Sequence, residues 1–205
     1  MAVMTTGNTS RADANRRRIL DVALAELLRD PDASMDQIAR AAGVVRRTVY
    51  GHFPSREALV DTIIDGAVEA VAVAQEAARA GVRDPAEAVA RSVLAIWEIA
   101  DRYRLLVALA QRTVTVRSIR ERLAPVRESA VELLQQGLDE GEFSSPLPAP
   151  ALAFVHEQIL FALMEAVNED LLESPKAGRS AAVTVLTAAG VPAGEATGLV
   201  AKLSG

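Results

Sequence analysis

The sequence predicts an all-α protein, and three observations carry this prediction. Alanine, the best helix former and a poor strand former, fills 39 of the 205 positions. Apolar residues recur at the spacing of amphipathic helices over most of the chain. Glycine, proline and helix-capping residues separate these segments, and no stretch alternates apolar and polar residues for long enough to require a strand.

The N-terminal segments are the easiest to delimit. Residues 1–11 are mostly small and polar without a period, which predicts a flexible tail. An amphipathic helix follows over residues 15–29. Ser34 then begins a second helix as its N-cap, because Gln37 stands where it completes a capping box. Gly43 ends that helix, since glycine readily adopts the positive φ found at helix ends.

Similar signals divide the rest of the chain. Ser55 caps a long helix, Asp84 and Pro85 begin the next one, and Pro125 is expected to kink or split a later one. The segment over residues 150–173 is apolar almost all round, which predicts a helix buried on more than one side. The further predicted helical segments are approximately 46–52, 56–80, 85–101, 103–112, 116–140, 150–173, 180–189 and 194–203.

Composition favours a folded, soluble, cytoplasmic protein. Half of the residues are hydrophobic and 24% are charged, which supplies enough apolar surface for a core. No uninterrupted apolar run approaches the roughly 20 residues that cross a bilayer, and the N-terminus lacks a secretory signal pattern. Without cysteine there is no disulfide or thiolate metal site, and His52 and His156 give no metal-ligand spacing. We therefore expect no metal or cofactor.

The net charge of −5 is unevenly distributed along the chain. Residues 1–60 carry nine arginines and seven acidic residues, a balance of +2, whereas residues 61–205 carry a balance of −7. An asymmetry of this size arises by chance or marks a segment that binds nucleic acid. The positions of the N-terminal arginines are therefore more informative than their number.

The two helices on either side of Gly43 have the arrangement of a helix-turn-helix over about residues 34–53, whose second helix lies in the DNA major groove. Val49 and Phe53 are expected to hold the second helix on the core. Arginine bonds guanine edges, and Thr, Tyr and His suit phosphate oxygens. The spacing alone also permits an ordinary helical bundle with a solvated basic face. The side chains expected to point outward belong to Arg46, Arg47, Thr48, Tyr50, Gly51 and His52.

Residues 38–59 read IARAAGVVRRTVYGHFPSREAL and resemble the DNA-binding signature of TetR-family transcriptional regulators. That signature has Ile-Ala, Ala-Gly-Val, Thr, an aliphatic residue, Tyr, an aromatic residue or His, Phe, then Ser-Lys-Glu and Leu. Arg56 replaces the usual lysine. The resemblance is strong over about residues 12–70 and thins beyond them to a pattern of helices.

This resemblance implies an all-α homodimer. An N-terminal three-helix domain over residues 12–60 binds DNA, and a larger helical domain over residues 61–205 dimerises and binds a small-molecule effector. The protein is then a repressor that the effector releases from a near-palindromic double-stranded operator, with an activator as the alternative. By position, Arg46, Arg47 and Gly51 face bases, while Ser34, Thr48, Tyr50, His52 and Arg56 hold phosphates.

Two residues depart from a regular recognition helix. Val45 stands where the family usually places Ser or Thr, so the helix loses an N-cap at a cost of about 1 kcal/mol, although the valine methyls suit a thymine methyl. Gly51 interrupts the helix at a similar cost of about 1 kcal/mol. Either the backbone approaches DNA at Gly51 or the position makes no contact. Likewise, Arg11, Arg16, Arg17 and Arg18 either touch DNA or form a solvated helix start.

The effector site is less defined by the sequence. Large side chains that suit an apolar pocket belong to Trp97, Tyr103, Phe154, Phe161 and Met164, and polar partners are available from Gln158, His156, Glu157, Arg104 and Arg112. The alternative for each is a place in the core or the dimer interface. The helices over 150–173 and 180–189 are expected to form a four-helix bundle with those of a second subunit.

Two other classes of function are alternatives to a DNA-binding regulator. An enzyme is not expected: His156-Glu157 lacks the second histidine of a zinc protease, because position 160 is leucine, and no nucleophile elbow or Walker loop occurs. An all-α scaffold or interaction module that has lost operator binding would be expected to have a disrupted recognition helix, whereas Arg46, Arg47, Thr48 and Tyr50 are intact. Salt-dependent DNA binding separates the two.

Overall fold

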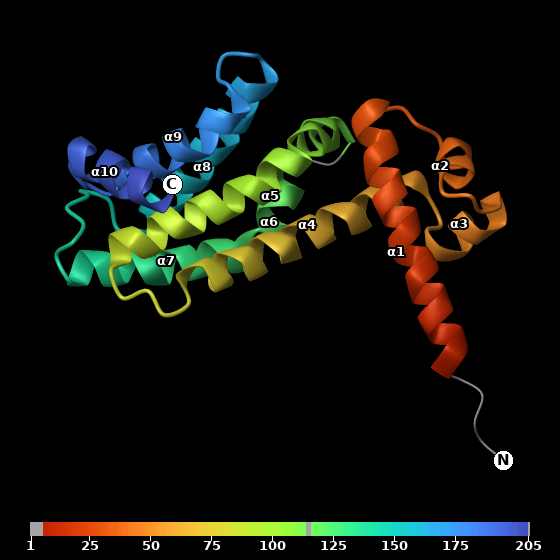
Figure 1. Cartoon of the computed structure of the whole chain (residues 1–205), viewed down its shortest axis with the longest axis horizontal. Coiled ribbons are helices and arrows are strands. Elements are labelled where there is room, and N and C mark those ends of the chain that lie inside the picture. Colours follow the sequence, from red (N-terminus) through yellow and green to blue (C-terminus); the bar gives the residue numbers. More distant parts are fainter. Residues whose placement is uncertain (1–5, 114–115, 205) are drawn as a thin grey trace. The chain divides into compact units, whose positions relative to one another are not determined.

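The computed structural model describes residues 6–113 and 116–204, and the side chains of residues 12–103 and 119–204. Within these residues all regular structure is helical, which confirms the predicted all-α class (Figure 1). The helices are α1 (Thr6–Arg29), α2 (Met35–Ala41), α3 (Arg46–His52), α4 (Arg56–Arg79), α5 (Pro85–Thr113), α6 (Val116–Arg122), α7 (Ala124–Asp139), α8 (Ala149–Asn168), α9 (Ser174–Ala188) and α10 (Ala193–Leu203).

The chain divides into two compact units. The first comprises the chain up to Gly66 together with the end of α5 from Leu105 onward. The second comprises Ala67–Arg104 and the chain from Thr115 onward. Helix α4 therefore contributes to both units, and the division falls at a glycine in its middle.

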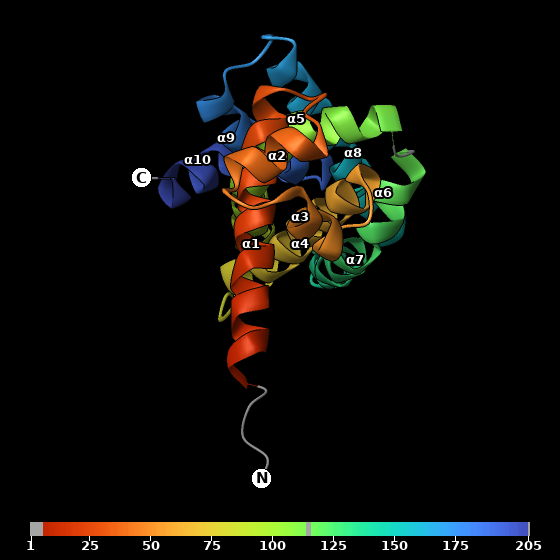
Figure 2. The ribbon, with the colours of Figure 1, turned by 90° about the vertical axis from the view of Figure 1, so that its right-hand side faces the viewer.

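In the first unit, α2 packs against both α1 and α3 (Figure 2). The predicted capping box of α2 is present: the Ser34 hydroxyl accepts from the Gln37 N–H at 3.3 Å, and the Gln37 side chain accepts from the Ser34 N–H at 2.7 Å. Gly43 follows with a φ of 63°, as predicted for a helix end. Almost fully buried side chains form the core of this unit, namely Ile19, Leu27, Ile38, Val49, Phe53 and Leu59.

Helix α1 is longer than predicted, because it begins at Thr6 rather than at residue 15. Residues 6–11 of the predicted tail thus form its first turns, and residues 1–5 lie outside the described residues. The segment contains no proline, and extending a formed helix costs far less than nucleating a new one. A polar composition alone was therefore a poor indicator of a tail.

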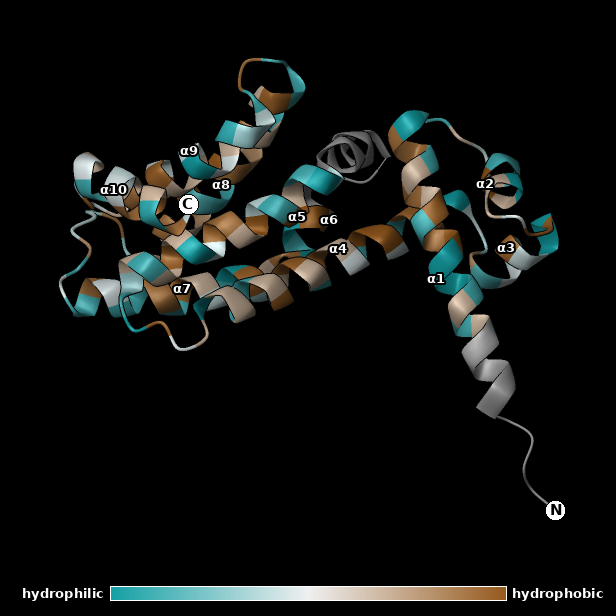
Figure 3. Ribbon diagram, viewed as in Figure 1, coloured by the Kyte–Doolittle hydropathy of each residue, from teal (hydrophilic) through white to brown (hydrophobic). Residues whose placement is uncertain are grey.

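The second unit has a core shared by α5, α7, α8, α9 and α10. Apolar and polar residues alternate along these helices at intervals that suit amphipathic packing (Figure 3). A glycine allows one close approach in this core: a Cβ at Gly178 of α9 would lie 2.8 Å from the Trp97 indole of α5. Its buried side chains include those of Trp97, Leu134, Phe143, Leu152, Met164 and Leu186.

Several helix boundaries differ from the prediction. The predicted segments 85–101 and 103–112 form the single helix α5, because the polar residues between them include neither glycine nor proline. Helix α8 ends at Asn168 rather than at residue 173, and α9 begins at Ser174 rather than at residue 180. Pro175 in the first turn of α9 was the overlooked start signal. The predicted split near Pro125 is confirmed, since α6 ends and α7 begins there.

Helix α8 is, among the described residues, the one helix long and apolar enough to cross a membrane by length and composition alone. Core helices of soluble proteins meet the same criterion. Three consecutive polar residues, His156, Glu157 and Gln158, stand near the middle of α8, and its residues Leu152 and Met164 belong to the core of the second unit. The packing of α8 therefore accounts for part of its apolar composition, since 28% of its apolar window is buried.

Candidate nucleic-acid interface

Helix α3 presents one anchored face and one exposed face. Val49 is 0% exposed and Phe53, directly after the helix, is 1% exposed, so these two side chains fix α3 on the core of the first unit. Its outward face carries a positive charge at two adjacent positions. Arg46, Arg47, Tyr50 and Gly51 are exposed, whereas Thr48 and His52 are half-buried.

The N-terminus of α3 has no side-chain cap. Val45 occupies the N-cap position in an extended conformation, and its side chain makes no capping hydrogen bond. By contrast, Ser34 caps α2, and Ser55 accepts a hydrogen bond from the N–H of Ala58 at the start of α4 (3.1 Å). Val45 is also 70% exposed, so it does not contribute to the core either. The two methyl groups of Val45 are therefore exposed to solvent beside the basic face of α3.

The two adjacent arginines of α3 have different surroundings. Arg46 donates from Nη1 to the Asp36 carboxylate at 2.9 Å and from Nη2 to the Tyr50 hydroxyl at 3.3 Å. Its guanidinium also lies 5.0 Å from the centre of the Tyr50 ring. Arg47 has no hydrogen-bond or ion-pair partner among the described residues. The guanidinium of Arg47 is thus available to a ligand without breaking a contact.

Arg56, predicted as a phosphate contact, makes hydrogen bonds within the first unit. Its Nε donates to the Ala33 carbonyl at 3.2 Å, and its Nη2 donates to the Pro31 carbonyl. Both acceptors belong to the loop between α1 and α2, so Arg56 fastens this loop to the start of α4. The half-buried guanidinium thus satisfies two backbone carbonyls, and its phosphate contact stays a prediction.

The remaining predicted contacts lie close to α3 or on the adjoining helices. Ser34 is exposed, although its hydroxyl takes part in the capping box. The His52 ring lies 6.2 Å from the Phe53 ring. A Cβ at Gly51 would meet no atom of the described residues within 4 Å, so none of their side chains requires glycine there. Among the N-terminal arginines, Arg16 lies over the Phe53 ring at 5.3 Å.

The predicted effector residues do not form a single group. Trp97 and Met164 are buried in the core, and Phe161 packs against that core. Phe154 is 46% exposed, and the guanidinium of Arg120 lies 5.5 Å from its ring. Tyr103 is half-buried with Arg102 beside its ring. The side chains of Arg11, Arg104 and Arg112 lie outside the described residues.

A charged network joins α6 and α7 to α8. Arg127 pairs with Glu157 (Nη1 to Oε2, 2.5 Å), and Arg120 donates to the Gln158 side chain at 2.6 Å. The Arg120 Nε lies 3.9 Å from the other Glu157 oxygen, and neither of these two buried atoms has a hydrogen-bond partner in the part of the chain that the structure describes. Gln158, predicted as an effector contact, is therefore already engaged by an arginine.

His156 on α8 is 7% exposed. Burial lowers its pKa to about 4, and a hydrogen bond with the Val185 backbone opposes this shift only in part. The imidazole is therefore neutral near pH 7. Its Nε2 is buried without a hydrogen-bond partner among the described residues.

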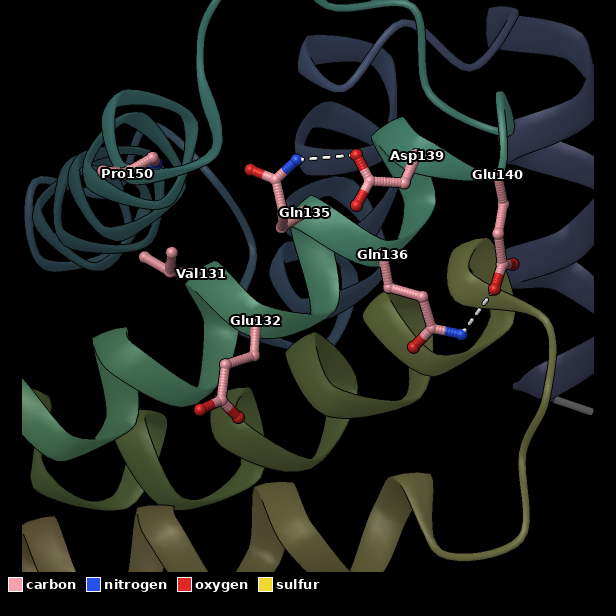
Figure 4. A pocket seen from close by; sticks show the side chains of 7 residues that line it. All are labelled: Val131, Glu132, Gln135, Gln136, Asp139, Glu140 and Pro150. Atoms are coloured by element: carbon pink, nitrogen blue, oxygen red, sulfur yellow. Dashed lines mark hydrogen bonds between the residues drawn. The ribbon is translucent and has the colours of Figure 1, made fainter.

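Two surface depressions of the second unit lie away from the predicted effector residues. One, of about 610 Å³, is lined by α7 and by Pro150 at the start of α8 (Figure 4). In it, Gln135 and Gln136 donate to Asp139 and Glu140 one turn later, at 2.8 and 2.9 Å. The other lies between α9 and α10 and includes Arg179 and Thr197. Neither depression includes any of the six predicted effector residues.

Asp36 is the residue of this surface that the sequence analysis missed. The sequence indicated it only as an acidic residue in the first turn of a helix, a common and stabilising position. Its pairing with Arg46, ten positions later, depends on how α2 and α3 pack together. No periodicity or motif in the sequence predicts that contact.

Comparison with known proteins agrees with the location of this surface. The family model of bacterial regulatory proteins of the TetR family matches residues 19–63, which include α2, α3 and the start of α4. An uncharacterised helix-turn-helix transcriptional regulator, TtgW of Pseudomonas putida, is 38% identical over 63 residues, which cover 30% of this chain and 47% of that protein. The regulator EthR of Mycobacterium tuberculosis is 41% identical over 64 residues, covering 29% of this chain and 30% of EthR. The matching segment thus spans less than half of either relative.

Solved structures with the same fold extend over most of the chain. RolR in complex with resorcinol aligns with a TM-score of 0.66 and 20% identity, covering 95% of this chain and 96% of RolR. LfrR of Mycobacterium smegmatis in complex with proflavine aligns with a TM-score of 0.67 and 22% identity, covering 86% of this chain and 96% of LfrR. At such identities the alignments establish the fold, and the sequence matches concern the N-terminal domain.

Proposed function

We propose that this chain is a member of the TetR family of bacterial regulatory proteins, whose family model matches residues 19–63, and that it is a sequence-specific DNA-binding transcriptional regulator of the cytoplasm. The observation that carries the proposal is the exposed face of α3, where Arg47 has no partner among the described residues while Val49 and Phe53 anchor the helix. In this proposal residues 12–60 bind DNA and residues 61–205 bind an effector and dimerise. The protein acts as a repressor that the effector releases.

The test is binding to DNA fragments selected from a genomic pool by the purified protein. Regulators of this kind neutralise phosphates, so the affinity for the selected duplex falls steeply as salt increases. A scrambled duplex of equal length gives the nonspecific affinity. If neither duplex binds in a salt-dependent way, the chain is the scaffold or interaction module that is the second candidate. Turnover of an added compound would instead indicate an enzyme.

Dimerisation is proposed to use α8 and α9. One face of α8 enters the core of the second unit, whereas the opposite face carries four apolar and two polar residues and is at least partly accessible. Two DNA-binding domains held by one dimer match the two half-sites of a near-palindromic operator. The residues of this accessible α8 face are Ala151, Phe154, Val155, Gln158, Ala162 and Glu165.

The effector is proposed to be a small organic molecule that binds the second unit. Two proteins of the same fold, RolR and LfrR, are solved with resorcinol and proflavine. The proposed contact residues are Trp97, Tyr103, Phe154, Gln158, Phe161 and Met164, of which Trp97 and Met164 are core residues whose side chains would have to shift. Release requires only that the effector bind the DNA-free arrangement more tightly than the DNA-bound one.

Helix α4 is the proposed route from effector to DNA. It runs without interruption from Arg56, in the first unit, to Arg79, in the second. Within the second unit, Arg79 donates to the Ser129 carbonyl of α7 at 3.2 Å, which fastens the end of α4 there. A displacement of this end is therefore passed along a continuous helix toward the DNA-binding unit.

Replacing Arg47 by Ala is expected to cost about 1–3 kcal/mol of binding free energy on the selected duplex and much less on the scrambled one. An arginine that reads a guanine edge loses specific contacts, whereas phosphate contacts are common to all sequences. Fluorescence titrations on both duplexes measure the difference. Arg40→Ala is the matched control, because Arg40 is an exposed arginine of α2. Equal losses on both duplexes for Arg47→Ala would contradict base reading.

Replacing Gly51 by Ala is expected to stabilise the protein and weaken DNA binding. Alanine is better than glycine inside a helix by about 1 kcal/mol, and the added Cβ meets nothing in the protein. If the α3 backbone approaches DNA at Gly51, the same methyl group collides with the duplex. Denaturant unfolding and operator titration measure the two effects. A stabilised variant with unchanged affinity would show that Gly51 makes no contact.

A further inference from the structure

Arg46 is held by two protein groups that use both of its terminal nitrogens. Nη1 donates to the Asp36 carboxylate at 2.9 Å, and Nη2 donates to the Tyr50 hydroxyl at 3.3 Å. The pair lies at the surface, since the Arg46 and Asp36 side chains are 63% and 50% exposed. Arg47, the next residue, has no such partner among the described residues.

The ion pair with Arg46 is not needed to explain why position 36, in the first turn of α2, is acidic. Asp36 lies in the first turn of α2, where a carboxylate is favourable through the helix dipole alone. Its pairing with Arg46 instead joins two helices across the helix-turn-helix. The Asp36 carboxylate therefore offsets the positive charge of Arg46, and it does so on the surface that binds DNA in the proposed function.

The Asp36 carboxylate and an acceptor group of DNA compete for the hydrogen-bond donors of the same guanidinium, that of Arg46. Arginine binds carboxylate and phosphate through similar charge-assisted hydrogen bonds, and it binds guanine through the same donors. An exposed ion pair contributes about 0–1 kcal/mol, so an incoming acceptor can displace it. When DNA takes Arg46, the Asp36 charge is left unpaired close to the phosphates.

We propose that Asp36 competes with DNA for the guanidinium of Arg46 and thereby weakens binding to DNA of any sequence. This inference rests on the proposed DNA-binding function. The competition lowers the sequence-independent part of the affinity, since any duplex must displace the carboxylate. Arg47, the other arginine of α3, has no such partner among the described residues. It can therefore bind DNA without displacing a carboxylate.

The experiment is a double-mutant cycle with Asp36→Asn and Arg46→Ala in the full chain. Asn keeps the size of Asp36 and removes its charge. Asp32→Asn is the matched control, because Asp32 is an exposed acidic residue of the loop before α2 and is not among the Arg46 partners. Each variant is titrated with the selected duplex and the scrambled duplex at several salt concentrations, and thermal unfolding verifies that each is folded.

Asp36→Asn is expected to raise the affinity for both duplexes about three- to fivefold at low salt. The slope of log affinity against log salt should become steeper by about one, because Arg46 then contributes its full charge to counterion release. The gain should vanish when Arg46 is Ala. Asp32→Asn should give a smaller gain that is the same with and without Arg46.

Two results would overturn the inference while leaving the proposed function intact. An equal gain from Asp36→Asn with and without Arg46 would mean that Asp36 acts only through its long-range charge. A loss of affinity in Asp36→Asn would mean that the carboxylate positions Arg46 for DNA instead of competing with it. Failure of the unaltered protein to bind either duplex would overturn the proposed function itself.

Discussion

Replacing Ala162 by Glu is expected to convert the protein to a monomer and to lower its operator affinity by at least about a hundredfold. Ala162 is exposed on the face of α8 opposite the core residues Leu152 and Met164. In the proposed dimer this position lies against a second subunit. A carboxylate there must give up its hydration without a partner, which costs several kcal/mol.

The loss of operator affinity follows from the loss of the second DNA-binding domain. In a dimer the second half-site is bound intramolecularly, and such linkage raises affinity by about 10²–10⁴. An interface able to hold the dimer without DNA belongs to the class of about 2,000 Å² or more. Sedimentation velocity and operator titration measure both effects in one preparation.

The matched control for Ala162→Glu is Ala201→Glu. Ala201 is also an exposed alanine inside a helix, but it lies on α10, which is not one of the two helices of the proposed interface. This variant should remain dimeric and bind the operator normally. A dimeric Ala162→Glu variant would place the interface elsewhere, and an unaltered protein that sediments as a monomer at micromolar concentration would refute the proposed homodimer.

The fold was largely predictable because its signals are local. The capping box of Ser34 and Gln37, the positive φ of Gly43 and the helix break near Pro125 all depend on residues close together in the sequence. The same holds for the buried Val49, which alternates with exposed residues within one short helix. The boundary between α8 and α9 was missed where apolar residues continue past the true end of α8.

The surroundings of individual side chains were not predictable, because tertiary packing decides them. Arg56 occurs in a motif position that suits a phosphate, yet the loop from Pro31 to Ala33 lies within its reach and takes its hydrogen bonds. Arg46 and Arg47 are indistinguishable in the sequence, and only the packing of α2 against α3 separates their surroundings. Trp97 is a candidate pocket residue from its size alone, and no pattern in the sequence predicts that the absence of a side chain at Gly178 gives its indole a place in the core.

The free energy of unfolding is expected to fall as the pH drops from about 6.5 to 4, and His156 should account for about 3 kcal/mol of that loss. Burial lowers the pKa of His156 to about 4 from an ordinary value of 6.5. Between these values the unfolded chain binds a proton that the folded chain excludes, so protonation favours unfolding. The contribution is complete above pH 6.5, is lost progressively on acidification and changes no further below pH 4.

The comparison is with His156→Gln, which does not titrate and offers an amide donor to the Val185 backbone. This variant should show a flatter pH dependence between 6.5 and 4, even if it is less stable at neutral pH. His52→Gln is the control, because it removes the other histidine, which is only half-buried. Denaturant unfolding at a fixed protomer concentration measures both, since dimerisation makes stability depend on concentration. If wild type and His156→Gln lose stability in parallel on acidification, the folded protein binds the proton as readily as the unfolded chain, and the imidazole is not held neutral by burial.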